Sequence, residues 1–292
     1  LGFWPGGDRD GNPFVTTKIT LKTANKLRSD IIKNYYRDIR SLRRRLTFKN
    51  VESKVVSIED RLYKSIFNEN RIPRISLTEL KNDLNEIKDI LVLEHNSLFL
   101  DELQDIIDKV KIFGYHFASL DIRQDSRIHS NVFNSIFKIS QKKMNKLFPP
   151  NYNNFSEDKK IKVISKIKGD ISPDLFEDDL ANSTLSSIRA MKEIQLSNGE
   201  KASNRYIISN NQSALNILEV FTMFRLSDWE NPTVDIVPLF ETVSDLKVAP
   251  KVMEAVYSND VYKKHLNQRK NQQTNMLGFS DGTKDGGYLM AN

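Results

Sequence analysis

Hydrophobic positions in the first part of the chain recur at steps of three and four. Between residues 18 and 46 they fall at Leu21, Ala24, Leu27, Ile31, Tyr35, Ile39, Leu42 and Leu46. This spacing predicts a long amphipathic helix. Ser76 and Glu79 have the spacing of a capping box, which predicts the start of a second helix. A third helix is expected over about 98–113, ending at Gly114. The pattern therefore predicts a helical part over about 16–113.

At residues 115–123 the hydrophobic positions recur at every second residue: Ala118, Leu120 and Ile122 alternate with more polar side chains. Alternation predicts a strand. Three further strands are expected at 205–209, 235–241 and 274–281. Helices are expected between them, over about 181–197, from Ser213 to about Arg225, and over 245–257. Alternating strands and helices predict parallel strands with right-handed crossovers. The sequence therefore predicts an α/β fold that is predominantly helical.

The stretch 141–180 interrupts this alternation. It contains Pro149, Pro150 and several asparagines, together with a lysine-rich segment near 157–168 that predicts a short helix. Such composition is typical of loops. We expect a mobile, exposed excursion here.

Composition excludes several classes of protein. No apolar run approaches the ~20 residues that a transmembrane helix needs, and no signal peptide is recognisable. The absence of cysteine excludes disulfides and thiolate metal sites, and it fits a cytoplasmic location. The chain opens on Leu1 within a Gly-rich motif and ends shortly after another, so we expect an internal piece of a longer protein.

The formal net charge of +6 arises mainly from a basic stretch at 33–49. Its arginines are Arg37, Arg40, Arg43, Arg44 and Arg45. Two interpretations are open, a solvated helix face or a surface that binds an acidic partner. The chain carries no recognised nucleic-acid-binding motif, so no nucleic-acid partner is expected.

Two carboxylates end two of the predicted strands: Glu241 ends 235–241 and Asp281 ends 274–281. In a parallel barrel the site lies where the strands end, and two carboxylates there would suit Mg²⁺ or Mn²⁺. The spacing alone favours a simpler interpretation, in which both residues cap the helices that follow. Both interpretations stay open at this point.

Two basic residues are candidates for binding an anion. Arg123 ends the first predicted strand and could clamp a phosphate or carboxylate; it could equally pair with Asp121 or Asp125. Lys284 lies in a Gly-rich stretch, residues 278–287, whose backbone could approach an anion. That stretch lacks the Gly-Lys-Ser/Thr order of a P-loop, and an ordinary turn is the alternative.

Four segments together resemble one family, the phosphoenolpyruvate carboxylases, in the family's order and at similar spacing. They are LGFWPGGDRDGNPFVT (1–16), LDIRQDSRIH (120–129), VPLFETVSDL (237–246) and LGFSDGTKDGGYLMA (277–291). The resemblance spans nearly the whole chain, with weaker similarity in the intervening helices. It implies that residues 1–292 are a single fragment of a TIM-type (β/α)8 barrel with many extra helices.

The resemblance also implies an activity and a set of site residues. The family adds bicarbonate to phosphoenolpyruvate, giving oxaloacetate and phosphate, with Mg²⁺ or Mn²⁺ and without biotin. This is anaplerotic carbon fixation that feeds the tricarboxylic acid cycle. Glu241 and Asp281 match metal ligands, and Arg123 matches an arginine that binds the substrate phosphate. Lys284 matches an active-site lysine, while Arg9 and Asp10 match motif residues near the site.

Other features of the family have no counterpart in these residues. The catalytic histidine of a Thr-Ala-His-Pro motif would lie upstream, and a Gly- and Arg-rich loop with a second histidine would lie downstream. We therefore expect the isolated chain to be inactive. The resemblance also implies that the parent enzyme is a homotetramer. The alternative hypothesis is a non-catalytic module that binds an acidic partner through helix 33–49. Intact charges at Arg123, Glu241, Asp281 and Lys284 argue against it.

Overall fold

The structure, a computed structural model, describes residues 2–67, 74–143 and 147–291. The chain divides into two compact units. Unit 1 comprises Leu1–Gly2, Leu21–Ser119 and Glu193–Ala202, and unit 2 comprises Phe3–Thr20, Leu120–Lys192 and Ser203–Asn292. Parallel strands and a majority of helix confirm the expected α/β class.

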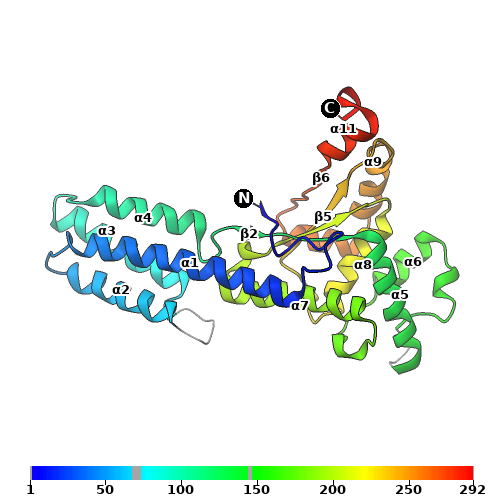
Figure 1. The fold of residues 1–292 in the computed structure, drawn as a ribbon, viewed down its shortest axis with the longest axis horizontal. Coiled ribbons are helices and arrows are strands. Elements are labelled where there is room, and N and C mark those ends of the chain that lie inside the picture. Colours follow the sequence, from blue (N-terminus) through cyan, green and yellow to red (C-terminus); the bar gives the residue numbers. More distant parts are fainter. Residues whose placement is uncertain (1, 68–73, 144–146, 292) are drawn as a thin grey trace. The chain divides into compact units, whose positions relative to one another are not determined.

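Unit 1 is built from helices α1 (Thr17–Arg43, of which the first turn belongs to unit 2), α2 (Glu52–Ile66), α3 (Leu77–Glu94) and α4 (Leu100–Phe113), which lie side by side (Figure 1). Their apolar faces meet in one core that includes Ile39, Leu62, Leu84 and Val110. The predicted periodicity of α1 is confirmed, although the helix ends three residues early. The capping box of α3 is also confirmed, because Ser76 and Glu79 bond to each other's backbone N–H.

The basic stretch of α1 has acidic partners within unit 1. Arg43 lies 2.8 Å from Glu59, and Arg45 pairs with Glu102. At least part of the positive charge at 33–49 is therefore neutralised by this unit's own helices.

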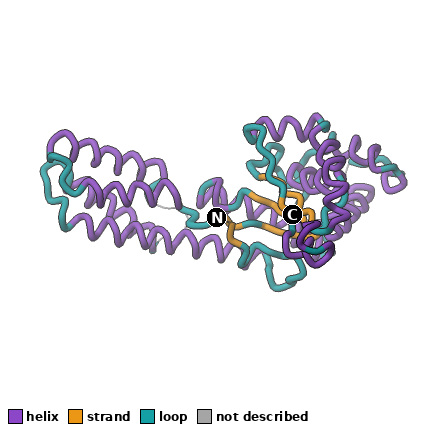
Figure 2. The backbone as a smooth tube through the Cα atoms, turned by 90° about the horizontal axis from the view of Figure 1, so that it is seen from above, coloured by secondary structure: helices purple, strands orange, loops and turns teal. Residues whose placement is uncertain are grey.

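Unit 2 contains a four-stranded parallel sheet in the order β3-β4-β5-β6. The strands are β3 (Ile122–Asp125), β4 (Arg205–Ser209), β5 (Asp235–Phe240) and β6 (Met276–Leu277). Two short strands, β1 (Gly2–Phe3) and β2 (Ser119–Leu120), form a separate pair. The helices of this unit are α5 (Ser126–Lys143), α6 (Glu157–Ile164), α7 (Asp179–Asn198, whose end belongs to unit 1), α8 (Ala214–Arg225), α9 (Val243–Tyr257), α10 (Asp260–Gln268), α11 (Phe279–Gly286) and α12 (Tyr288–Ala291). Figure 2 shows these strands grouped together with helices alongside.

The two faces of this sheet differ in what covers them. Ile122, Tyr206 and Ile236 lie in the large apolar core with residues of α5 and α8. Ile207, Val237 and Leu239 form a small cluster with Met276. Because side chains alternate along a strand, these residues lie on the opposite face. Arg123 pairs in register with Ile207, so the candidate site belongs to this second face.

The first and last predicted strands differ from the expectation. β3 runs to Asp125, so Arg123 is its second residue and does not end the strand. The chain turns through residues 115–118 after Gly114, and Phe117 has a φ of 62°, so the strand prediction at 115–118 was wrong. At the other end, β5 stops at Phe240, which pairs with Leu277. Residues 279–281 therefore have no strand to pair with, and they start α11 instead. Asp281 lies in the first turn of that helix and does not end a strand.

The segment 141–180 is only partly the exposed excursion that its composition suggested: Asn151, Asn153 and Asn154 are exposed, but apolar residues of the segment are buried. The described part contains Phe148, Tyr152, Ile164 and Ile171, all buried in the large core. The short helix near 157–168 is present as α6. This helix packs against α8, and the buried apolar residues hold the rest of the segment against the protein.

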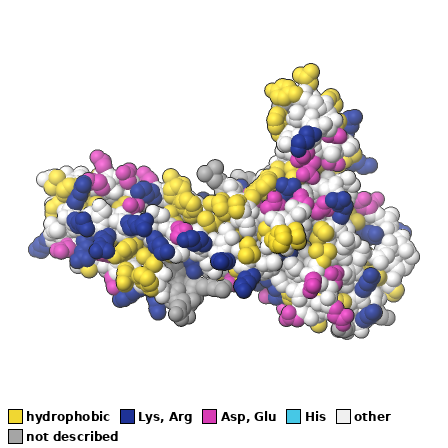
Figure 3. Space-filling model, viewed as in Figure 1, with side chains coloured by type: hydrophobic (Ala, Val, Ile, Leu, Met, Phe, Trp, Pro, Cys, Tyr) yellow, Lys and Arg dark blue, Asp and Glu magenta, His cyan; other side chains and the backbone are white. Residues whose placement is uncertain are grey.

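Figure 3 shows hydrophobic side chains gathered at the tip formed by α11 and α12. Phe279, Tyr288, Leu289 and Met290 are all more than half exposed. None of the described helices is both long enough and apolar enough to cross a membrane.

Candidate active site

The Gly-rich segment near the N-terminus lies along the edge of β3. The Arg9 N–H donates to the Arg123 carbonyl at 2.9 Å, and the Arg123 N–H donates to the Gly7 carbonyl at 3.2 Å. A Cβ added to Gly7 would lie 2.0 Å from the Asp121 carbonyl oxygen. Only glycine allows the two backbones to approach this closely, which explains why the motif has glycine at position 7. The pairing brings Asp8 and Asp10 beside Arg123.

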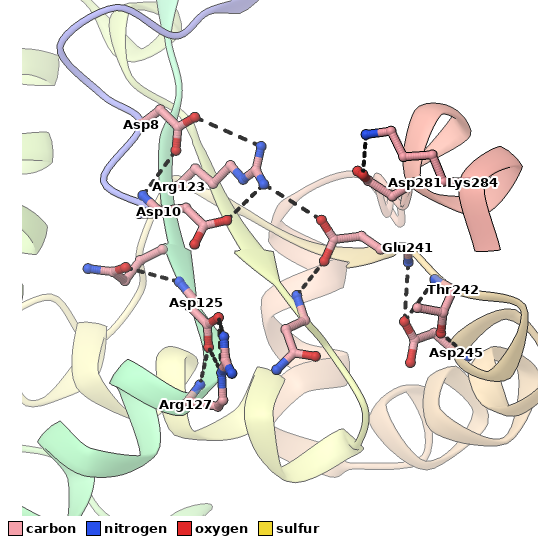
Figure 4. Close-up of polar contacts among 12 residues, drawn as sticks. Asp8, Asp10, Arg123, Asp125, Arg127, Glu241, Thr242, Asp245, Asp281 and Lys284 are labelled. Carbon is pink, nitrogen blue, oxygen red and sulfur yellow. Dashed lines mark hydrogen bonds and ion pairs between the residues drawn. The ribbon is translucent and has the colours of Figure 1, made fainter. Parts of the chain in front are cut away.

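Arg123 lies at the centre of a group of carboxylates (Figure 4). Its Nη2 donates to Oδ2 of Asp10 at 2.8 Å and lies 3.6 Å from Oε1 of Glu241. Its Nη1 lies 3.8 Å from Oδ2 of Asp8. The guanidinium also lies over the ring of Trp4, 5.1 Å from its centroid, a favourable cation–π arrangement.

The simpler pairing considered for Arg123 is not the one observed. Asp121 accepts a hydrogen bond from Nε of Arg205 at 2.7 Å, and Asp125 pairs with Arg127 at 2.6 Å. Both neighbouring aspartates are thus engaged elsewhere, and Arg123 is directed toward carboxylates from the N-terminal segment and from β5.

Glu241 follows β5 directly and points toward Arg123 (Figure 4). Its Oε2 accepts a hydrogen bond from the Asn210 N–H at 2.9 Å, and Asn210 holds a left-handed φ of 51°. Burial raises the pKa of Glu241, and the charges of Asp281 and Asp10 raise it further. The bond from Asn210 and the charge of Arg123 act in the opposite direction. Thr242, not Glu241, caps α9, so the capping interpretation of Glu241 was wrong.

Asp281 and Lys284 lie together on α11. Their side chains approach to 3.3 Å and are largely exposed. Figure 4 shows the pair on α11, beyond Glu241 as seen from Arg123. Asp281 is close enough to influence the pKa of Glu241, and Gly278 lies against Glu241, because a Cβ there would be 3.1 Å from its Cα and Cγ. The N-cap of α11 is Gly278, so Asp281 does not cap that helix.

Arg9 is directed elsewhere. It is 9% exposed and donates from Nη1 to the Ser183 carbonyl at 3.0 Å and from Nη2 to the Ser183 hydroxyl. Burial lowers the pKa of its guanidinium. Arg9 lines a cavity of about 1220 Å³ together with Gln124, Asp125 and Arg127. The structure thus brings Arg123, Glu241 and Asp281 into one neighbourhood and engages Arg9 with α7.

Divalent cations require a particular set of donors, and this neighbourhood supplies part of it. Among the described residues, no group of three or more His, Cys, Asp or Glu side chains is placed to hold a metal ion. Mg²⁺ needs only one or two protein carboxylates, because water and substrate oxygens complete its shell. Glu241 and Asp281 provide oxygen donors of the right kind. Burial is the main cause that raises the pKa of Glu241, and the charges of Asp281 and Asp10 add to it, so a bound cation would favour the ionised carboxylate. The carboxylate oxygens of Glu241 and Asp281 are therefore chemically suited to binding Mg²⁺ or Mn²⁺.

Several residues of this neighbourhood were not among the sequence candidates. Trp4 covers Arg123, Asp8 flanks it, and Asn210 holds Glu241. Asp285 accepts a hydrogen bond from the Val243 N–H at 2.9 Å. Trp4 and Asp8 belong to the N-terminal motif and could have been selected from it. Asn210 acts through its backbone, for which the sequence carries no signal.

Comparison with known proteins places these residues in a family. The phosphoenolpyruvate carboxylase family model matches residues 1–76 and 68–292. Phosphoenolpyruvate carboxylases of Nitrosomonas eutropha and Nitrosomonas europaea are each 29% identical over 341 aligned residues, and that of Corynebacterium glutamicum is 27% identical over 350. Each alignment covers the whole chain but only 36–37% of the relative's length. The Arg123, Glu241 and Asp281 neighbourhood thus lies in a chain that belongs to the phosphoenolpyruvate carboxylase family.

Proposed function

We propose that this chain forms the phosphate- and metal-binding part of an enzyme that carboxylates phosphoenolpyruvate with bicarbonate, giving oxaloacetate and phosphate. The observation that supports this most is that the guanidinium of Arg123, from within β3, lies 3.6 Å from Glu241, which follows β5, with Asp281 on the next element. These side chains come from three segments far apart in sequence. Glu241 follows the C-terminal end of a parallel strand, which is where α/β folds place their sites.

The charges of this neighbourhood support a divalent cation. Four carboxylates, those of Asp8, Asp10, Glu241 and Asp281, surround two cations, Arg123 and Lys284. When all are ionised, the group carries a formal charge of −2. Glu241 and Asp281 would hold the metal, which when bound supplies Lewis acidity to an oxygen of the substrate. Mg²⁺ and Mn²⁺ both suit these donors.

Arg123 would bind the phosphate or carboxylate of phosphoenolpyruvate. A guanidinium offers a planar set of donors that matches either anion. Asp10 and Trp4 hold this group in place, so little side-chain freedom is lost when an anion binds. Lys284 would add a second positive charge near the transferred phosphoryl group. For Arg9 we propose a supporting role, because its own bonds go to Ser183.

We also propose that the β3–β6 sheet is an arc of a TIM-type (β/α)8 barrel. Its strands are parallel, follow one another in sequence order and are joined through helices. In the parent protein this arc would be completed by other strands, and the enzyme would be a cytoplasmic homotetramer supplying oxaloacetate to the tricarboxylic acid cycle. The second hypothesis, an acidic partner on helix 33–49, gains no support from ion pairs that already engage Arg43 and Arg45.

A binding experiment tests the proposal on this chain. Mn²⁺ is titrated into the protein, followed by electron paramagnetic resonance, with and without phosphoenolpyruvate. We expect phosphoenolpyruvate to tighten Mn²⁺ binding. Glu241→Gln and Asp281→Asn should each abolish Mn²⁺ binding, and Arg123→Gln should remove only the effect of phosphoenolpyruvate.

Glu254→Gln is the matched control, because Glu254 is an exposed carboxylate on α9 outside the neighbourhood. It should bind Mn²⁺ like the wild type. Equal Mn²⁺ affinity in the wild type, Glu241→Gln and Asp281→Asn would contradict the proposed metal site. No effect of phosphoenolpyruvate in the wild type would contradict the proposed substrate.

A further inference from the structure

Helix α11 contacts the turn between β5 and α9 at three points. Before the helix begins, Gly278 lies against Glu241, with 3.1 Å between a hypothetical Cβ and the Glu241 Cα. In its last turn, Asp285 accepts the hydrogen bond from the Val243 N–H at 2.9 Å. Gly286 lies so close to Val243 that a Cβ would be 2.4 Å from its Cγ2. The helix is therefore docked at both ends on the residues around Glu241.

The contact made by Asp285 meets a need of α9. The first N–H groups of a helix lack partners within the helix. At the start of α9, the side chains of Thr242 and Asp245 each accept a hydrogen bond from the other's backbone N–H. The acceptor of the Val243 N–H lies outside α9. Asp285 provides that acceptor and places a negative charge at the positive end of α9. This bond thus links α11 to the residue two positions after Glu241.

Asp281 lies four residues before Asp285 on the same helix. Residues four apart lie on one face of a helix, so the face of α11 that meets α9 is also the face that carries Asp281. The placement of Asp281 relative to Glu241 is consequently determined by how α11 docks. Gly278 fixes the start of the helix and Asp285 with Gly286 fixes its end.

We propose that Asp285 is a positioning residue for the metal ligands, which holds α11 on the first turn of α9 so that Asp281 and Glu241 can act on one cation. This inference rests on the proposed function for the metal itself. It assigns to Asp285 no contact with substrate or metal. Gly286 takes part in the same docking, because any side chain there would push α11 away from Val243.

The first test compares Asp285→Ala with Asp285→Asn in the Mn²⁺ titration. Alanine removes the acceptor, whereas an asparagine oxygen can still accept from the Val243 N–H. Loss of a residue that orients a metal ligand typically weakens metal binding roughly 10- to 100-fold. We expect that loss for Asp285→Ala and near wild-type affinity for Asp285→Asn. Asp260→Ala, which removes an acid from the first turn of α10, is the control and should leave affinity unchanged.

A second test needs no metal. Hydrogen exchange of the Val243 amide, followed by nuclear magnetic resonance in the metal-free protein, should accelerate in Asp285→Ala and stay slow in Asp285→Asn. Unchanged exchange in Asp285→Ala would show that this bond does not hold α11 and would overturn the inference. The result is independent of whether the proposed metal site exists.

A third test uses steric complementarity between the two helices. Gly286→Ala should weaken Mn²⁺ binding, because its Cβ meets the Val243 Cγ2. Val243→Ala removes that methyl group, so the double variant should regain affinity relative to Gly286→Ala. Failure of the second substitution to restore binding would count against docking as the cause.

These outcomes separate the inference from the proposed function. Absence of Mn²⁺ binding in the wild type would contradict the metal site, while the amide exchange would still decide the role of Asp285 in docking. Wild-type binding that is unchanged in Asp285→Ala would overturn the inference and leave the metal site in place.

Discussion

Arg123 donates a hydrogen bond to Asp10 at 2.8 Å, although 113 residues separate them in the chain. The bond joins the N-terminal Gly-rich segment to β3. Because Arg123 also lies 3.6 Å from Glu241, its charge acts on a third segment. The carboxylates around Arg123 are therefore electrostatically coupled, and changing one should change the titration of another.

The charge of Asp10 raises the pKa of Glu241, whereas the charge of Arg123 lowers it. Asp10→Asn should therefore lower the pKa of Glu241, and Arg123→Gln should raise it. The pKa can be measured by carbon nuclear magnetic resonance of the glutamate carboxyl groups, with the Glu241 signal identified by its absence in Glu241→Gln. Shifts of the same sign in both variants would contradict the observed arrangement.

The close packing of Gly7 on β3 gives a prediction about the edge of the sheet. Gly7→Ala places a Cβ 2.0 Å from a backbone oxygen of Asp121, and such overpacking typically costs about 1–3 kcal/mol of unfolding free energy. The backbone must shift, so exchange of the Arg9 and Arg123 amides should accelerate as well.

Gly11→Ala is the control for this substitution. Gly11 has a φ of 66°, and a Cβ added there would meet no atom within 4 Å, so only backbone strain of about 1 kcal/mol is expected. Exchange at Arg9 and Arg123 should stay at the wild-type rate. Equal acceleration in both variants would show that steric contact with Asp121 is not the cause.

Glu219 gives a prediction about stability and pH. Burial raises the pKa of this carboxyl group to about 7, and it accepts a hydrogen bond from Ser130 at 2.9 Å. The folded state holds its proton more tightly than the unfolded state, for which the ordinary value is 4.5. Stability should therefore fall as pH rises from about 4.5 to about 7, by roughly 3 kcal/mol in total.

Glu219→Gln should remove this pH dependence, because glutamine stays neutral and still accepts from Ser130. The variant should be more stable than the wild type at pH 8 and similar near pH 4.5. Urea unfolding followed by tryptophan fluorescence suits this measurement, since both tryptophans, Trp4 and Trp229, lie in unit 2. Glu254→Gln, at an exposed site, should retain the wild-type profile.

The capping box of α3 allows a test within unit 1. Ser76→Ala removes the acceptor of the Glu79 N–H and should cost about 1 kcal/mol of unfolding free energy. Exchange of the Glu79 amide should accelerate at the same time. Thr78→Ala, in the same turn and exposed, should be neutral or slightly stabilising. A loss of equal size at both positions would argue against the cap.

Local sequence patterns predicted helices and strands correctly where these elements depend on residues that are neighbours in the chain. The helices around Leu84 and Ile217 follow from apolar spacing and from caps at Ser76 and Ser213, whose partners lie three residues away. The strands at 205–209 and 235–241 were predicted within one residue. Patterns of this kind succeed because their hydrogen bonds or buried faces repeat over short distances.

The predictions were wrong where contacts between residues far apart in the chain determine the structure. The last predicted strand extended to Asp281, but β6 ends at Leu277 because β5 offers no partner beyond Phe240. Tyr152, within the Asn-rich segment, is buried because it packs against Phe133 and Phe137 of α5, which the composition of the segment does not reveal. Arg123 pairs with Asp10 and not with its neighbours Asp121 and Asp125, because Arg205 and Arg127 engage those two.

The sequence alone determined the α/β class, most of the helices and the family resemblance, together with the candidates Arg123, Glu241 and Asp281. These depend on residue types and short spacings that are visible in the chain itself. Only the tertiary structure decided that Asp10 and Glu241 share one guanidinium, that Arg9 bonds to Ser183, and that α11 docks on α9 through Asp285. Those contacts join segments that the chain keeps far apart, and their energies depend on distance and burial, which only the folded arrangement sets.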